Sequence, residues 1–169
     1  ITMGIGAANV ARENQAFSGS AQKQAQLREV LIGYLRRNGR LPCPDTDFAA
    51  PDGVENRATP GDPTTACAAR FGILPYVTLG LSRDTAQDGW GNFFSYQVSN
   101  AAGANTDWTR SAGFRAGNTG TITVNDRNGA VVTPVATNVV AVIVSHGRNA
   151  LGAYSIAGTR NSLPAAGTD

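Results

Sequence analysis

The stretch LREVLIGYLRRNGRLPCP, residues 27–44, decides the fold expected for this chain. Its first part is rich in leucine, arginine and other helix formers and contains no proline, whereas its last three residues hold two prolines around a cysteine. Asn38 and Gly39 supply a helix C-cap, and Arg36 and Arg37 fall in the last turn, where cations suit the helix dipole. A helix is therefore predicted to end near residue 38.

Upstream of this stretch the helical pattern continues back to about Val10. Residues of one helix face follow one another at steps of three and four: Phe17, Ala21, Gln24, Leu27, Leu31, and then Tyr34 or Leu35. Ser18, Gly19 and Ser20 weaken the middle of the pattern, which allows a bend or a later start. Because the first half is polar and the second half is apolar, only the second half is predicted to pack on a core.

Residues 40–75 form a segment rich in proline, aspartate and glycine, in which six prolines oppose regular structure. Cys43 and Cys67 lie in this segment, which has little else to hold it, so we predict a disulfide and an oxidising compartment. Closing a loop of this length stabilises a fold by roughly 3 kcal/mol. The alternative is two free thiols in a cytosolic protein.

The second half of the chain is predicted to form a small antiparallel sheet. The expected elements are a turn at Gly89–Asn92, a strand over Phe93–Val98, a hairpin of Thr121–Asn125 and Ala130–Val135, a central strand buried on both faces over Val139–Val144, and a short strand over Ala153–Ala157. One long helix followed by a loop and strands predicts an α+β fold, with the helix laid on the sheet.

Length and composition limit the classes of function. The 169 residues suit one domain, with residues 1–39 as a helical spine and 40–169 as a globular head. A net charge of +2 argues against a nucleic-acid footprint over the whole domain. One histidine and two cysteines exclude a histidine-rich zinc site and an iron–sulfur cluster held by this chain alone. We therefore expect no metal site and no cofactor.

Two clusters of polar residues allow chemistry and also have simpler explanations. Seven acidic residues lie close in sequence, where Asp-x-Asp and Asp-Gly spacings can bind calcium but also stabilise turns, the interpretation we favour: Asp45, Asp47, Asp52, Glu55, Asp62, Asp84 and Asp88. Ser145 and His146 suggest a serine nucleophile with its base. Adjacent strand residues point to opposite faces, however, so we favour a histidine that stabilises a turn.

Two further groups are candidate structural or binding residues. Asp88, Trp90, Gly91 and Asn92 predict a tight turn that anchors Trp90 in the core, with glycines on both sides of the tryptophan to permit positive φ. A basic patch is expected from Arg36, Arg37 and Arg40. These arginines could contact a partner, DNA or acidic lipid, or simply complement the helix C-terminus.

Three motifs together resemble the type IV pilin-like family, and within it the minor pilins and the type II secretion pseudopilins. The first is the helix end that runs through Leu31-Ile32-Gly33-Tyr34 into Arg40-Leu41-Pro42-Cys43-Pro44. The second is Gly72–Leu81 followed by Asp88-Gly89-Trp90-Gly91-Asn92 and an aromatic strand. The third is Val142–Asn149 followed by Gly152-Ala153. These motifs span residues ~20–155.

The resemblance implies a helical spine with a β head, and a structural rather than enzymatic function. It implies an apolar helical segment and a prepilin cleavage site upstream of Ile1, which would anchor the precursor in the inner membrane with a periplasmic head. Its partners would be other pilin or pseudopilin subunits and the assembly machinery, in a pilus or pseudopilus filament. The major secretion pseudopilins, which this chain resembles at the Asp88–Asn92 turn, bind calcium in a late loop rich in glycine and aspartate. The matching residues 145–158 contain no Asp or Glu, which departs from that pattern.

Two other classes of function stay open at this stage. One is a soluble or surface-exposed binding module, an adhesin or a DNA-binding tip, that uses the arginines at the helix end and Trp108. The other is a small hydrolase built around His146.

Overall fold

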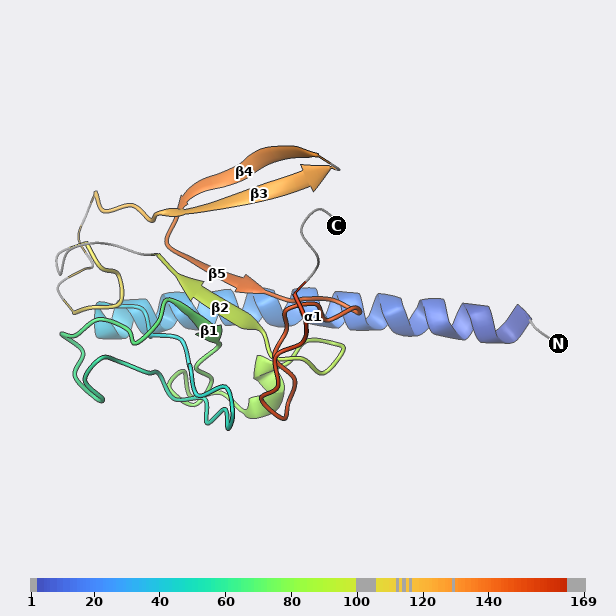
Figure 1. Ribbon diagram of the computed structural model, residues 1–169, viewed down its shortest axis with the longest axis horizontal. Coiled ribbons are helices and arrows are strands. Elements are labelled where there is room, and N and C mark those ends of the chain that lie inside the picture. Colours follow the sequence, from blue (N-terminus) through green and yellow to red (C-terminus); the bar gives the residue numbers. More distant parts are fainter. Residues whose placement is uncertain are drawn as a thin grey trace.

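A long helix lies along a small β head in the computed structural model, which describes residues 3–99, 106–111, 113, 115, 117–128 and 130–163 (Figure 1). The elements are α1 (Met3–Asn38), β1 (Phe71–Ile73), the 3₁₀ helix η1 (Arg83–Ala86), β2 (Ser95–Val98), β3 (Ile122–Asn128), β4 (Val131–Val139) and β5 (Ala141–Val144). β1, β2 and β5 form an antiparallel sheet in that order, and β3 and β4 form a separate hairpin. The α+β prediction is confirmed.

α1 is continuous over 36 residues, a length of roughly 54 Å. It begins earlier than predicted and is not interrupted at Ser20. The Ser20 hydroxyl donates to the Ala16 carbonyl at 2.7 Å and accepts the Gly89 amide at 2.8 Å, so this serine serves a contact with the head. The predicted C-cap is confirmed, because Gly39 has φ +64° and its amide donates to the Leu35 carbonyl at 2.8 Å.

The two halves of α1 have different surroundings. Leu27, Leu31 and Tyr34 in the second half are buried in the core, as predicted. In the first half Val10 is 59% exposed and Phe17 is 70% exposed. Figure 1 shows this N-terminal half running out past the head.

The segment Val139–Val144 is not the central, doubly buried strand that its apolar sequence predicted. Val139 pairs with Ile122 in the hairpin, the chain bends at Val140, and only Ala141–Val144 joins β2. β5 therefore lies at the edge of the sheet and is at most half-buried. Gln24 of α1 donates to the Ile143 carbonyl at 3.2 Å, so the helix caps part of that edge.

Other elements of the head also differ from their predicted bounds. The hairpin is longer than predicted, and its pairing continues to Asn128–Val131. The predicted strand at Ala153–Ala157 is wrong, because Tyr154 makes only isolated bridges there, to Phe93 and Arg160. The segment 40–75 is not wholly irregular, since it contains β1 and a bridge between Asp45 and Ile73.

The contact between α1 and the turn at Gly89 yields a paired test. A Cβ on Gly89 would lie 2.2 Å from the Ala16 carbonyl oxygen, which is helix backbone and cannot move aside. Gly89→Ala is expected to lower the free energy of unfolding by about 1–3 kcal/mol through overpacking. At helical Gly19 a Cβ meets nothing within 4 Å, so Gly19→Ala should raise the free energy of unfolding by roughly 0.5–1 kcal/mol. Urea unfolding measures the free energy of unfolding of both variants. Equal changes in the two variants would contradict the close contact between Gly89 and α1.

Candidate functional site

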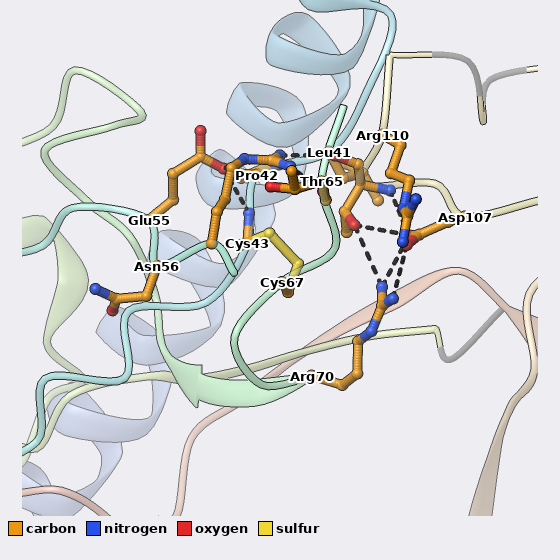
Figure 2. The surroundings of a disulfide bond; sticks show 12 residues. Leu41, Pro42, Cys43, Glu55, Asn56, Thr65, Cys67, Arg70, Asp107 and Arg110 are labelled. Atoms are coloured by element: carbon orange, nitrogen blue, oxygen red, sulfur yellow. Dashed lines mark hydrogen bonds and ion pairs between the residues drawn. A yellow bond between two sulfur atoms is a disulfide. The ribbon is translucent and has the colours of Figure 1, made fainter. Parts of the chain in front are cut away.

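The predicted disulfide between Cys43 and Cys67 is present (Figure 2). Both cysteines are buried, and their Cα atoms lie 5.3 Å apart across a sequence separation of 24 residues. The bond joins the segment that leaves α1 to the segment that enters β1. It therefore holds the long loop against the end of the helix.

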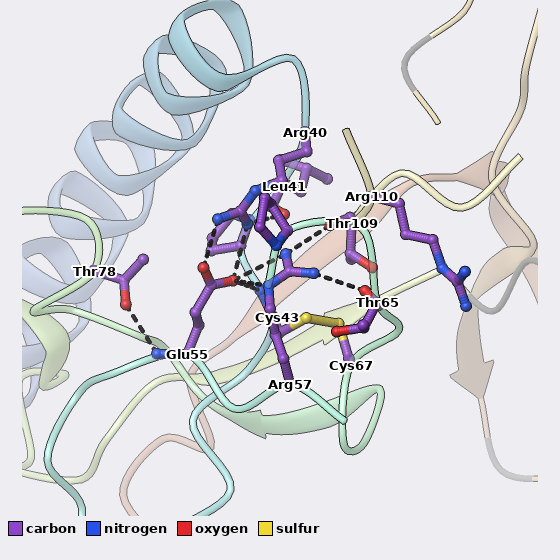
Figure 3. A network of polar contacts seen from close by, with 12 residues as sticks. Arg40, Leu41, Cys43, Glu55, Arg57, Thr65, Cys67, Thr78, Thr109 and Arg110 are labelled. Carbon is purple, nitrogen blue, oxygen red and sulfur yellow. Dashed lines mark hydrogen bonds and ion pairs between the residues drawn. A yellow bond between two sulfur atoms is a disulfide. The ribbon is translucent and has the colours of Figure 1, made fainter. Parts of the chain in front are cut away.

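A largely buried carboxylate, that of Glu55 with 13% of its side chain exposed, organises the loop beside this disulfide. Glu55 accepts both Nη atoms of Arg40, at 2.9 and 2.6 Å, the backbone amide of Cys43 at 2.9 Å and Nε of Arg57 at 3.2 Å (Figure 3). Burial acts to raise the pKa of Glu55, but the hydrogen bonds from Arg40 and Cys43 outweigh it and the pKa is lowered. The carboxylate therefore stays ionised.

Arg40 does not join an exposed patch with Arg36 and Arg37. It is 9% exposed and bound to Glu55, while Arg36 and Arg37 are exposed on the last turn of α1. The reason is the C-cap at Gly39, where the chain leaves the helix and turns Arg40 inward. Only two of the three arginines that the DNA-binding interpretation used are exposed at the helix end.

Asp107 forms a second buried carboxylate cluster. It accepts Arg70 through both oxygens, at 2.8 and 2.7 Å, and also Nε of Arg110 and the hydroxyl and amide of Thr109 (Figure 2). Burial alone would raise the pKa of Asp107, but these bonds lower it to about 2. Sequence reasoning missed this cluster because Arg70 and Asp107 are far apart in the chain.

The Asp88 turn is confirmed, but Trp90 does not enter the core. Asp88 accepts the amides of Trp90 and Asn92, both at 3.0 Å, and the Ser145 hydroxyl at 2.8 Å, and Gly91 has φ +82°. Trp90 is half-buried beside the first half of α1, where it lines a polar pocket with Arg12 and Arg148, among others. The phenylalanines that follow the turn are fully buried instead.

The acidic residues act mainly as turn acceptors. Carboxylate oxygens of Asp45, Asp47 and Asp52 lie within 4.8 Å of one another, and among the described residues no other candidate metal-binding group occurs. The two carboxylate oxygens of Asp45 accept hydrogen bonds from the backbone amides of Asp47 and Gly53. The Asp52 carboxylate accepts one from the backbone amide of Val54. This use of the oxygens matches the favoured interpretation.

Ser145 and His146 have different partners, as strand alternation predicts. The ring of His146 bonds the Leu151 carbonyl through Nδ1 and the Ser95 hydroxyl through Nε2, each at 2.8 Å. Because a carbonyl only accepts, Nδ1–H donates, and burial lowers the pKa of His146, which favours the neutral ring. Ser95 is 0% exposed, so its hydroxyl is out of reach of a substrate.

An apolar groove lies between α1 and β5. Its volume is about 530 Å³, and its lining includes Leu31, Ile32, Trp108 and Ile143, with Arg28 among the polar contributors. Sequence reasoning missed this groove because it forms where the helix, the segment around Trp108 and the sheet edge meet.

Searches against protein-family models, curated proteins and solved structures find no match to this chain. Within the described ranges, α1 lacks an apolar stretch long enough to cross a bilayer.

The Asp107 cluster gives a pH-dependent test. The pKa of Asp107 is about 2 in the folded chain, against an ordinary value of 3.8. The unfolded chain therefore binds a proton at this carboxylate more readily than the folded chain does. The stability from this group is present above pH ~4 and is lost as pH falls toward 2, a total of about 2–3 kcal/mol. Urea unfolding should show a gap between wild type and Asp107→Asn at neutral pH that narrows over this window. A constant gap would contradict the assignment.

Proposed function

We propose that this chain is a structural, non-enzymatic subunit of a pilin-like filament. It would serve as a minor pilin of a type IV pilus or as a pseudopilin of a type II secretion system, and α1 would mediate assembly. One observation carries this proposal: the second half of α1 is anchored in the head, while the N-terminal end of the helix runs out past the head and Val10 and Phe17 are exposed (Figure 1).

A projecting helix of this kind gains stability from partners. Helices gain most of their stability in proteins from packing of an apolar face, and isolated helices are marginal in water. Phe17 and Val10 lie seven residues apart, so they share one face of α1. A neighbouring subunit would cover that face and stabilise the projecting half.

The head has the properties of a rigid assembly unit. The disulfide and the two buried carboxylate clusters hold its loops without much regular structure. A structural disulfide fits an oxidising compartment. We therefore propose a cell-envelope location, with a periplasmic head, an inner-membrane anchor upstream of this chain and other filament subunits as partners.

Site-specific photo-crosslinking in the cells that make the protein tests this function. A photoreactive residue replaces Val10 in the full-length precursor, and adducts are identified by mass spectrometry after envelope fractionation. The expected adducts are other filament subunits. The same probe at exposed Thr64, on the loop, reports general collisions. Adducts at Val10 no different from those at Thr64, with all protein in the soluble periplasmic fraction, would contradict the proposal.

A further inference from the structure

One face of α1 carries a heptad seam along most of the helix. Its residues follow alternating steps of four and three, the spacing at which one helix packs along another: Val10, Asn14, Phe17, Ala21, Gln24, Arg28, Leu31 and Leu35. The part of the seam up to Ala21 is exposed. From Gln24 onward the seam residues line the apolar groove. The seam therefore joins a projecting helix half to a groove on the same molecule.

The seam includes an exposed aromatic side chain, Phe17, and also residues that line the apolar groove, into which such a side chain could fit. Phe17 is 70% exposed, and the large apolar area of a phenylalanine ring contributes strongly to an interface when it is buried there. The groove offers Leu31 and Trp108, both buried at its base, with Ile32 and Ile143 beside them. We propose, on the basis of the proposed function, that the groove receives Phe17 of a second copy of this chain, with the two α1 helices parallel and offset by two heptads.

The offset follows from the residues along the seam. At two heptads, roughly 21 Å, Phe17 of one copy meets Leu31 of the other and Ala21 meets Leu35. The same offset brings Asn14 of one copy opposite Arg28 of the other, and Glu13 precedes Asn14 in the chain. The Glu13 side chain is about half-exposed while it pairs with Arg148 of its own head. In the proposed pair it would lie one residue from the position that meets Arg28.

Pairing in register is disfavoured by charge. It would place Arg28 opposite Arg28 and leave Phe17 opposite Phe17, outside the groove. Like charges that face each other across an interface are destabilising. Charge and apolar complementarity therefore select the same offset.

In an offset pair, Phe17 of one copy and the groove of the other copy have no partner. Each copy presents its Phe17 to one neighbour and its groove to another, which is a heterologous contact. Such contacts repeat without closing when the rotation between copies does not return to the start. Because each copy in the proposed pair is also shifted by roughly 21 Å along the helix axis, the row cannot return to its start and stays open, as a filament requires.

Self-association of the purified chain tests the docking. Sedimentation velocity over a concentration series is expected to show association, and Phe17→Ser should weaken it by roughly tenfold or more. Phe17 is exposed, so the variant should keep the wild-type circular dichroism spectrum. Val131→Ser, which removes another exposed apolar side chain on β4, is the matched control and should associate like wild type. Absence of association, or equal association of Phe17→Ser and wild type, would overturn the inference.

Disulfide trapping tests the offset. Chains carrying Ala21→Cys and Leu35→Cys are oxidised separately and as an equal mixture. The offset predicts a crosslinked dimer in the mixture and little in either variant alone. Dimers within each variant alone would mean pairing in register, and no dimers in the mixture would mean that the helices do not meet there. Either result overturns the offset but leaves the photo-crosslinking test in cells untouched, because α1 could still pack on different filament subunits.

Discussion

The carboxylate of Glu55 connects the end of the helix to the rest of the head. It binds Arg40, the first residue after the helix C-cap, and the amide of Cys43, where the disulfide begins. It also binds Arg57, which in turn donates to the carbonyls of Thr65 and Thr109. Removing one member of a buried ion pair leaves an uncompensated charge, at a cost of about 3–5 kcal/mol. The direction in which α1 leaves the head therefore depends on this group.

The same carboxylate explains how a loop with little regular structure can support a long helix. The Arg40 guanidinium lies 5.4 Å from the Tyr34 ring centroid, so the cluster also contacts the last turns of α1. Farther toward the N-terminus, Lys23 donates to the carbonyls of Asp84 and Gln87, and Ser20 accepts the amide of Gly89. Farther still toward the N-terminus, Glu13 forms an exposed ion pair with Arg148 of the head. The helix is thus divided into an anchored half and a half with little cover from its own head.

Local patterns in the sequence were enough to predict the helix, its cap at Gly39 and the disulfide, because each depends on residues close together or on a strong pairing rule. The failures concern segments that meet only in the folded chain. Arg40 is close to Arg37 in sequence, yet the cap separates a buried side chain from an exposed one. Ser20 weakens an isolated helix, but here it contacts the head.

The apolar run at Val139–Val144 shows the same limit for the sheet. Its composition is typical of a buried central strand, but a bend at Val140 divides it between the hairpin and the sheet edge. The apolar groove follows from that division, because β5 then lies beside α1 with its outer edge toward the helix. No local pattern contains this information. The position of the candidate interface therefore depends on tertiary contacts.

Hydrogen exchange along α1, measured by mass spectrometry on the chain at low and high concentration, most directly tests the account of a divided helix. Amides in residues 20–38 should exchange slowly at both concentrations, because they open only when the head unfolds. Amides in residues 8–16 should exchange quickly in the dilute chain and become protected as copies associate. Equal protection of both halves in the dilute chain, or no change on concentration, would contradict the account.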